Sequence, residues 1–334
     1  MRAMVLEEIA PIDTSPLKLT DLPVPDPPAG QVRLRVRCCA ICRTDLHVIE
    51  GELPRRKLPL IPGHQIVGVV DAVGRGCSTL NVGDRVGVAW LRHTCGTCRF
   101  CAAGRENLCE SQQFTGYHAD GGYAEHALVP EDFAYRIPEA FDDVSAAPLL
   151  CAGIVGYRAL KRSELPDGGK LAIYGFGSSA HVIAQIALHR GCEVYVVTRG
   201  ASHRELARRM GAKWVGQRAA DLPVKTDSAI IFAPAGELVP DALAALEKGG
   251  TLSLAGIYMT PIPRMDYEKY VFYERNIHSV TANTRQDGRE LLEEAATIPI
   301  RPHTTTYRLH EANQALQDLK ADRLNGTGVL VVTE

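Results

Sequence analysis

The fold of the second half of the chain is indicated by residues 170–180, KLAIYGFGSSA. The first five residues form a short apolar run typical of a buried strand, and the glycines that follow have the spacing G-x-G-x-x-A. In this pattern Gly175 makes the tight turn, Gly177 lets the backbone approach a pyrophosphate, and Ala180 keeps helix and strand close. The helix that begins here would present free N–H groups to the phosphates. The stretch therefore predicts a βαβ unit that binds a dinucleotide.

The same rhythm continues beyond this stretch. Apolar strand candidates recur at residues 192–198, 228–233 and 251–255. Ser202 and Glu205 have the spacing of a capping box, and the helix that they open should end at Gly211. Alternation of strands and helices implies right-handed βαβ units and a parallel sheet. We therefore expect a Rossmann dinucleotide-binding domain over residues 153–283.

The first half of the chain has strand patterning instead. Apolar and charged side chains alternate strictly over residues 32–38, the period of a half-buried strand. Further short apolar runs, punctuated by glycines, indicate an antiparallel barrel or sandwich. Two helical stretches and a last apolar strand at residues 328–332 follow residue 284. We expect this segment to return to the first domain, so that residues 1–152 and 284–334 form one β-rich domain.

Composition excludes several classes of protein. The 334 residues include 37 basic and 39 acidic side chains, a formal net charge of −2, which argues against a nucleic-acid partner. No apolar run approaches the roughly 18 residues of a membrane span, which argues against a membrane partner. The N-terminal residues lack the apolar core and cleavage site of a secretory signal. We therefore expect a cytoplasmic protein.

Four of the ten cysteines have the spacing Cys95-x2-Cys98-x2-Cys101-x7-Cys109. Zn²⁺ in structural sites is held by four soft ligands in a tetrahedron, and thiolates on tight turns can converge on one ion. The spacing makes chance clustering a poor explanation. Because all four coordination positions are filled, no position remains for a substrate. The cluster predicts a structural zinc site in a lobe at about residues 90–112.

Three further candidate ligands are dispersed along the chain: Cys42 in CRTDLH, His64 in GHQIVG and Cys151 in PLLCAG. Taken singly, each has an ordinary explanation, because a lone cysteine is usually a small buried hydrophobe. Together with the cysteine lobe and the glycine-rich turn, in this order, these motifs closely resemble the zinc-dependent alcohol dehydrogenases of the medium-chain dehydrogenase/reductase superfamily. The resemblance covers essentially the whole chain. It implies an α/β protein with a GroES-like β-rich catalytic domain and a Rossmann domain.

The resemblance implies that Cys42, His64 and Cys151 hold a catalytic zinc ion. The fourth coordination position would then be free for water or a substrate oxygen. Two thiolates and a neutral imidazole leave such a site about neutral, so the ion can act as a Lewis acid and stabilise an alkoxide. An alcohol that has lost its proton can then donate hydride from carbon.

Four neighbours of these ligands match further positions of the family's motif. Asp45 corresponds to a carboxylate that fixes the tautomer of His64, and the alternative is a surface aspartate that ends a turn. Thr44 and His47 match a proton relay, because a hydroxyl both donates and accepts and histidine titrates near neutral pH. Gln65 stands where the family usually has a glutamate, and its neutral amide lacks the charge of an anionic zinc ligand.

The resemblance assigns cofactor contacts to Arg43, Gly175, Phe176, Gly177, Ser178, Ser179, Ala180, Thr198, Arg199, Ala255, Gly256 and Ile257. An NAD-binding fold normally has Asp or Glu about 20 residues after the turn. Here the strand ends in VVTRG at residues 196–200. Arg199 could pair with a 2′-phosphate, which favours NADP over NAD, and the alternative is a solvated arginine in a turn. Thr327 stands where the family often has an arginine on the pyrophosphate.

The resemblance also predicts the reaction. The expected activity is reversible hydride transfer between NAD(P) and a small-molecule primary or secondary alcohol, aldehyde or ketone. The resemblance further implies two zinc ions per subunit and a homodimer or homotetramer. Trp90 lies where the family has an aromatic wall of the substrate pocket, although it could equally be a core residue. One alternative is a zinc-free NADPH reductase or quinone oxidoreductase on the same scaffold, against which the three dispersed ligands argue. Another is a binding or scaffolding protein built around the cysteine lobe.

Overall fold

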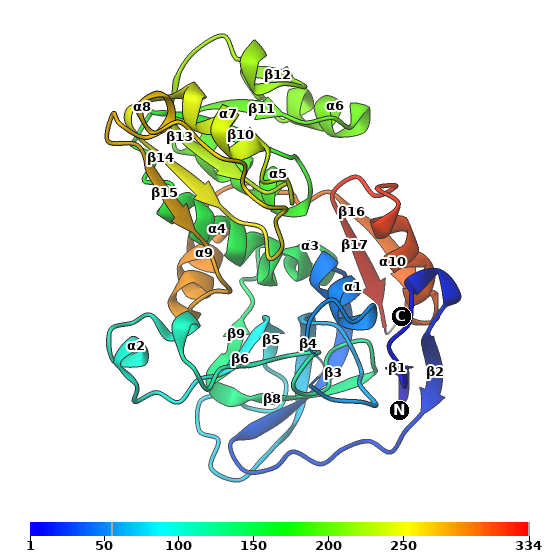
Figure 1. Ribbon diagram of the computed structural model, residues 1–334. Helices are drawn as coiled ribbons and strands as arrows, with labels where there is room; N and C mark the ends of the chain where they lie inside the picture. The colour runs from blue at the N-terminus through cyan, green and yellow to red at the C-terminus, as the bar shows by residue number, and fades with distance from the viewer. Residues whose placement is uncertain (55, 333–334) are drawn as a thin grey trace. The chain divides into compact units, whose positions relative to one another are not determined.

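A computed structural model describes residues 1–54 and 56–332 of the chain (Figure 1). The chain divides into two compact units. The first comprises the described parts of Met1–Cys151, Ala282–Ala296 and Pro302–Glu334, and the second comprises Ala152–Thr281 and Thr297–Arg301. Residues 297–301 lie with the second unit, where Arg301 N donates to Gln185 Oε1 at 2.9 Å.

The first unit is built on a seven-stranded sheet of order β16-β17-β3-β4-β5-β9, in which β8 also pairs with β3. Its pairs are antiparallel, except that β16 and β17 are parallel. Two-stranded sheets β1–β2 and β6–β7 complete the β structure. The strands are β1 (Arg2–Leu6), β2 (Leu17–Asp21), β3 (Gln31–Ala40), β4 (Gln65–Val73), β5 (Arg85–Val88), β6 (Leu91–His93), β7 (Gln113–Phe114), β8 (His126–Pro130), β9 (Ala134–Arg136), β16 (Thr304–Arg308) and β17 (Thr327–Val331). The helices are α1 (Arg43–Ile49), α2 (Arg99–Ala102), α3 (Asp143–Ala146), α9 (Arg285–Thr297) and α10 (Ala312–Lys320).

Strand β3 organises this sheet. Its apolar residues Val32, Leu34 and Val36 are buried and Arg35 is exposed, as the alternation predicts. The antiparallel register pairs Ala40 at the end of β3 with Gln65 at the start of β4. The chain segments just beyond those two residues are therefore brought to the same end of the sheet.

The second unit contains a six-stranded parallel sheet of order β12-β11-β10-β13-β14-β15. In sequence order this is 3-2-1-4-5-6, the strand order of dinucleotide-binding sheets. The strands are β10 (Lys170–Tyr174), β11 (Glu193–Val197), β12 (Trp214–Gly216), β13 (Thr226–Ile231), β14 (Leu246–Leu254) and β15 (Asn276–Ser279). The helices are α4 (Ala152–Arg162), α5 (Ser178–His189), α6 (Ala201–Arg209), α7 (Leu238–Ala245) and α8 (Tyr267–Tyr270). The predicted parallel α/β architecture is confirmed (Figure 1).

The predicted capping box of α6 is wrong. The helix begins at Ala201 with Gly200 as its N-cap, and no side chain caps it. The carboxylate of Glu205 lies 3.7 Å from Arg208 instead. This i,i+3 pairing along the exposed helix surface competes with the capping contact. Among the described residues, no helix is both long and apolar enough to cross a membrane.

Candidate active site and metal centres

The three dispersed ligand candidates converge in the first unit. The ligand atoms of Cys42, His64 and Cys151 all lie within 4.8 Å of one another. Cys42 is the N-cap of α1, and His64 directly precedes β4, so the register of β3 and β4 brings these two together. Cys151 follows a short 3-10 turn and precedes α4. Residues from three distant parts of the sequence thus form one site.

The surroundings of His64 fit a metal ion. The ring is fully buried, and its Nε2 has no hydrogen-bond partner among the described residues. The other nitrogen, Nδ1, lies 2.9 Å from Asp45 Oδ1. A proton held on Nδ1 by this carboxylate leaves the Nε2 lone pair free, which is the form of histidine that binds a metal. A buried ring nitrogen without a partner is costly unless a ligand engages it.

Asp45 is itself held on both carboxylate oxygens. Its Oδ2 accepts hydrogen bonds from the backbone N–H of Cys42 at 2.8 Å and from the hydroxyl of Tyr123 at 2.9 Å. Tyr123 is fully buried, and its ring lies against Gly63, where φ is +96° and an added Cβ would come within 2.3 Å of the ring. Tyr123 was not singled out from the sequence, because 78 residues separate it from Asp45.

The electrostatics of this site favour a thiolate. A hydrogen bond from Cys151 lowers the pKa of Cys42 and is the largest influence on it. The charge of His64 lowers this pKa further, so it lies well below its usual value even though burial acts to raise it. Burial alone would lower the pKa of His64, but Asp45 and Cys42 raise it to about 10. Thiolates and neutral imidazoles are the forms that bind a metal ion, so binding at this set would be accompanied by release of protons.

The two relay candidates lie on helix α1. Thr44 is buried, and its Oγ1 lies 3.7 Å from Cys42 Sγ. His47 is partly exposed, and its Nδ1 contacts the carboxylate of Glu52. Thr44 therefore lies beside the metal ligands, whereas His47 reaches the surface. The sequence did not reveal Glu52 as a partner of His47, because only the turn after α1 brings the two side chains together.

Gln65 is buried and its Nε2 donates to the backbone carbonyl of Ile41 at 3.2 Å. A glutamate carboxylate at this position could only accept hydrogen bonds, so it could not make this contact. The amide thus ties the start of β4 to the residue before Cys42. This contact gives a structural reason for glutamine at this position.

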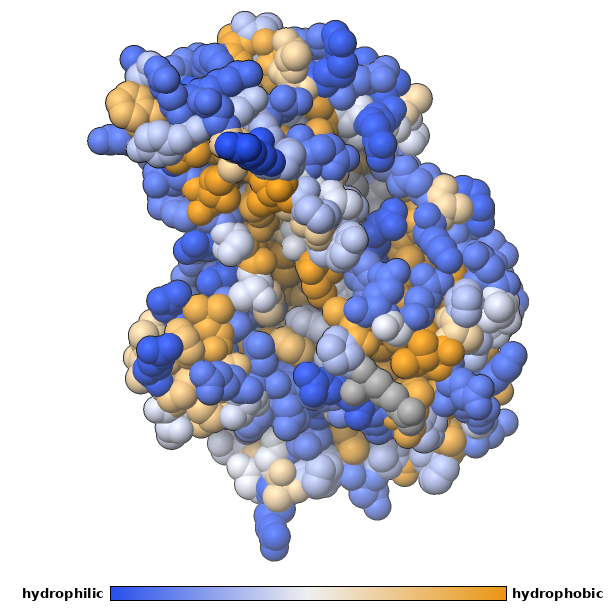
Figure 2. Space-filling view, viewed as in Figure 1, coloured by the Kyte–Doolittle hydropathy of each residue, from blue (hydrophilic) through white to orange (hydrophobic). Residues whose placement is uncertain are grey.

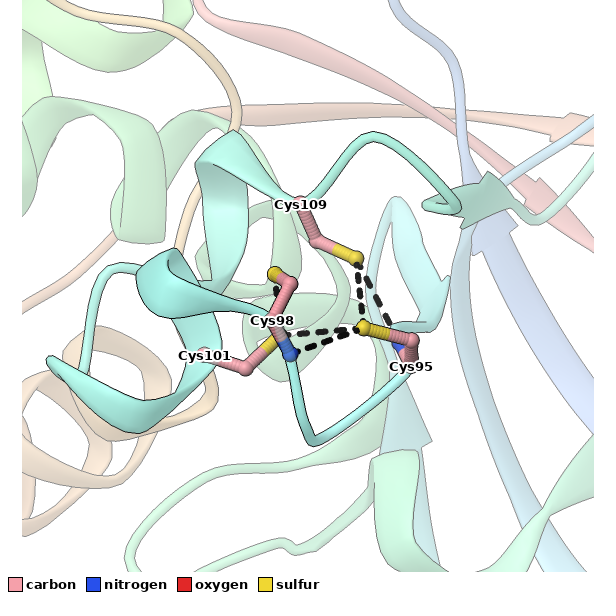
Figure 3. Close-up of side chains that lie close together, drawn as sticks. All are labelled: Cys95, Cys98, Cys101 and Cys109. Carbon is pink, nitrogen blue, oxygen red and sulfur yellow. Dashed lines mark hydrogen bonds between the residues drawn. The ribbon is translucent and has the colours of Figure 1, made fainter.

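The four clustered cysteines form a separate, closed set (Figure 3). Sγ of Cys95 lies 3.5 Å from that of Cys109 and 4.0 Å from that of Cys101, and Cys98 and Cys101 are 3.6 Å apart. With metal–sulfur bonds of about 2.3 Å, tetrahedral geometry requires sulfurs roughly 3.8 Å apart. Backbone N–H groups of Thr97 and Cys98 lower the pKa of Cys95 to about 6, which favours its thiolate. The geometry and charge of this set fit a structural zinc ion.

An ion pair inside the first unit anchors this lobe. Arg285, at the start of α9, donates from Nη2 to Glu106 Oε2 at 2.8 Å and from its backbone N to Glu106 Oε1 at 2.6 Å. Its guanidinium also lies 4.6 Å from the centre of the Phe133 ring. The pair spans 179 residues of sequence and carries no local signal, so the sequence did not reveal it.

Trp90 is buried and contacts the candidate ligand His64. Its ring centroid lies 4.8 Å from that of His64, edge to face, and it stacks on Phe114 at 4.7 Å and on Tyr117 at 5.8 Å. Val48 and Leu60 complete the hydrophobic cluster around it. Trp90 is thus both a core residue and a neighbour of the candidate metal centre.

The second unit contains the predicted cofactor turn. Gly175 has φ +84°, and an added Cβ would come within 3.1 Å of Ala233 N, so the turn requires glycine. Gly177 is the N-cap of α5, with open space where a Cβ would be, and Ala180 is fully buried. No atom thus crowds the backbone at Gly177, which suits the close approach of a phosphate to the start of α5.

The remaining cofactor candidates divide between the two units. In the second unit, the other candidates all lie beyond the carboxyl ends of parallel strands. The buried Phe176 follows β10, and Ser178 and Ser179 begin α5. Thr198 and Arg199 follow β11, and Ala255, Gly256 and Ile257 follow β14. Arg199 is exposed, and the guanidinium of Arg204 donates to the carbonyl of Thr198 at 3.3 Å and to that of Arg199. Arg43 is at the start of α1 in the first unit, and its assignment to the cofactor stays a prediction.

Comparisons with known proteins agree with this geometry. Residues 28–139 match the family described as "Alcohol dehydrogenase GroES-like domain", and residues 180–297 match "Zinc-binding dehydrogenase". The chain is 48% identical to the probable alcohol dehydrogenase AdhA of Mycobacterium tuberculosis, over 99% of this chain and 97% of that protein. It is 35% identical to an alcohol dehydrogenase of Geobacillus stearothermophilus, over the whole of both chains.

Solved structures are similar over almost the whole chain. A thermostable alcohol dehydrogenase from Pyrobaculum aerophilum with bound cobalt and zinc is 27% identical, with a TM-score of 0.88 and 99% of each chain covered. A cinnamyl alcohol dehydrogenase of Sorghum bicolor is 26% identical, with a TM-score of 0.89, covering 99% of this chain and 97% of that one.

Proposed function

The chain belongs to the zinc-dependent alcohol dehydrogenases of the medium-chain dehydrogenase/reductase superfamily, NAD(P)-dependent oxidoreductases, and from that premise we propose that Cys42, His64 and Cys151 hold the catalytic zinc ion. The observation that supports this most strongly is the buried Nε2 of His64, which faces two cysteines and has no other partner among the described residues. When bound, zinc supplies Lewis acidity, and the nicotinamide supplies or takes up hydride.

The residues around the site position the ligands and move the proton. Asp45 holds the proton of His64 on Nδ1 and so fixes the orientation of the ring. Thr44 is buried beside Cys42, where its hydroxyl can accept the proton of the substrate alcohol. His47 and Glu52 form the surface group that receives a proton from this direction. The rings stacked on Trp90 exclude water from the same side of His64.

Metal analysis of single variants tests this assignment. Wild-type protein should bind two zinc ions per chain, one in each ligand set. Cys151→Ala should retain the lobe zinc of Cys95, Cys98, Cys101 and Cys109 but lose the other ion and all turnover. Near wild-type activity with two zinc ions bound to Cys151→Ala would overturn the assignment.

We also propose that NADP(H) is the preferred cofactor. No carboxylate directly follows β11, where Arg199 and Arg204 add two cations instead. Charge-assisted hydrogen bonds from a guanidinium to a phosphate contribute roughly 1.5–3 kcal/mol, equivalent to about 10–100-fold in affinity. We expect kcat/KM to favour NADP(H) by this factor and Arg199→Asp to reverse the preference. A wild-type preference for NAD that Arg199→Ala leaves unchanged would refute the proposal.

A homo-oligomer, a dimer or tetramer, is the proposed assembly. Strand β15 lies at the edge of its sheet, and Phe272, Tyr273 and Ile277 are exposed close to or on it. Figure 2 shows hydrophobic side chains among hydrophilic ones over the region of α8. An exposed apolar sheet edge is a site for pairing with a second copy. Light scattering should give a multiple of the chain mass, and Ile277→Lys should lower it; a monomeric wild type would overturn the proposal.

A cytoplasmic location is proposed because all ten cysteines are free.

A further inference from the structure

Arg92, in the middle of β6, is a largely buried residue whose cation has no protein partner in the part of the chain that the structure describes. Only 6% of its surface is exposed. Among the described residues, its guanidinium forms no hydrogen bond, salt bridge or cation–π contact. Arginine has five N–H donors and stays charged in proteins. None of the Arg92 nitrogens is among the fully buried side-chain atoms that lack a partner, so the guanidinium remains within reach of solvent or a ligand. A group of this kind indicates a ligand that supplies the acceptor.

Burial lowers the pKa of Arg92, and the charge of the Asp120 carboxylate acts in the opposite direction. This carboxylate is already engaged, because its Oδ1 accepts hydrogen bonds from Lys57 Nζ at 2.6 Å and from the backbone N of Ile61 at 3.0 Å. Burial, followed by the charges of Arg56 and Arg92, lowers the pKa of His118. Arg56 and Arg92 thus both act on His118, and the carboxylate that acts on Arg92 already has other hydrogen-bond donors.

Arg92 lies beside an aromatic wall, the rings of Trp90, Phe114 and His118, which begins at the candidate metal centre. Arg92 follows Trp90 by two residues, and its strand β6 pairs with β7, which contains Phe114. The Trp90 ring touches that of His64, and Phe114 stacks on Trp90. The ring of His118 lies 5.6 Å from Phe114, and its pKa is affected by Arg92. The same aromatic wall thus contacts the candidate ligand His64 and lies beside the guanidinium-bearing strand β6.

We propose that Arg92 binds a carboxylate of the substrate, so that the enzyme acts preferentially on aldehydes and alcohols that carry a carboxylate several bonds from the reacting carbon. This inference rests on the proposed function, because it places the reacting carbon at the Cys42, His64 and Cys151 centre. A guanidinium accepts a carboxylate through two parallel N–H···O bonds, and the aromatic wall between the two ends suits a hydrocarbon chain. Trp90 contacts that chain, and Arg92 determines which end group is tolerated.

Matched aldehydes test this inference on the zinc-loaded holoenzyme. The pairs are 4-oxobutanoate with butanal, 5-oxopentanoate with pentanal, and 6-oxohexanoate with hexanal. For at least one pair, wild-type kcat/KM should be about 10–100-fold higher for the carboxylate, the factor expected of a charge-assisted pair. Arg92→Gln should abolish this ratio, mainly through KM for the carboxylate, and Arg92→Lys should retain part of it.

The matched control is Arg56→Gln, which removes the same charge from an exposed neighbour of His118. Its effect on the ratio should be small, because exposed charges are screened. The thermal midpoint of Arg92→Gln should be close to that of wild type, because the Arg92 guanidinium forms no hydrogen bond or salt bridge with the described residues that the substitution would remove. A wild-type ratio of one or less for every pair, or a ratio that Arg92→Gln leaves unchanged, would overturn the inference.

A binding measurement separates failure of this inference from failure of the proposed function. Absence of turnover with all six aldehydes would count against the proposed function. Calorimetric titration with pentanedioate decides the role of Arg92 independently of turnover. Binding should be at least about tenfold weaker in Arg92→Gln than in wild type, and equal affinities would refute carboxylate binding by Arg92.

Discussion

Tyr123→Phe should weaken the catalytic zinc site without changing any ligand. The substitution keeps the ring that packs on Gly63 and removes only the hydroxyl that donates to Asp45 Oδ2 at 2.9 Å. A hydrogen bond to a charged group contributes about 1.5–3 kcal/mol. Because the Cys42 backbone N–H still donates to the same oxygen, the lower end applies. At about 1.4 kcal/mol per factor of ten, the affinity for the catalytic zinc should fall about tenfold.

Competition with a chromogenic chelator measures this effect, because the chelator reports the zinc released from each of the two proposed sites. The dissociation constant of the catalytic zinc should rise about tenfold, whereas that of the lobe zinc should not change. Tyr135→Phe is the matched control, since the buried Tyr135 hydroxyl has no partner among the described residues. Unchanged zinc affinity in Tyr123→Phe, or equal losses at both zinc sites, would refute the reasoning.

The remaining predictions concern the relay and a buried carboxylate. Thr44→Ala should lower kcat by orders of magnitude and Thr44→Ser should be tolerated, because serine keeps the hydroxyl; equal losses in steady-state assays would exclude a proton-transfer role. His47→Gln should cost less, and its deficit should shrink as pH or buffer base rises, whereas a pH-independent collapse would make the residue structural. Burial would raise the pKa of Glu131, but hydrogen bonds from the backbone N–H groups of residues 78–80 hold it below the usual 4.5. The stability that Glu131 contributes is complete above pH 4.5 and is lost as pH falls through the lower pKa of the folded state. Glu131→Gln should therefore lower the thermal midpoint at pH 7, and the difference from wild type should vanish in acid.

The predictions that rest on local sequence patterns agree best with the structure. The G-x-G-x-x-A stretch lies between a strand and a helix, and the four lobe cysteines converge, because short loops leave the chain few other arrangements. The parallel sheet and the family are confirmed. The capping box at Ser202 failed because a motif of two side chains is easily overridden by a competing pair along the helix.

Contacts between distant segments could not be derived from the residues alone. Cys42, His64 and Cys151 were grouped by resemblance, and the structure shows that the β3–β4 register is what joins the first two. The bonds from Tyr123 to Asp45 and from Arg285 to Glu106 have no period or spacing that predicts them. Nor does composition reveal that Arg92 is largely buried with no acceptor among the described residues, because this follows only from knowing its neighbours.

The two cysteine-containing sites show how the same ligand type acquires different roles. In the lobe, backbone N–H groups from tight turns stabilise the thiolates and four sulfurs complete the tetrahedron, so an ion there has no free position. At Cys42, side chains provide the stabilisation instead, because the neighbouring Cys151 and the charge of His64 favour the thiolate and Asp45 orients the ring. With only three ligands, a zinc ion there keeps one position open for a substrate oxygen. The number of ligands supplied, and the charged neighbours that hold them, therefore distinguish the proposed structural site from the proposed catalytic one.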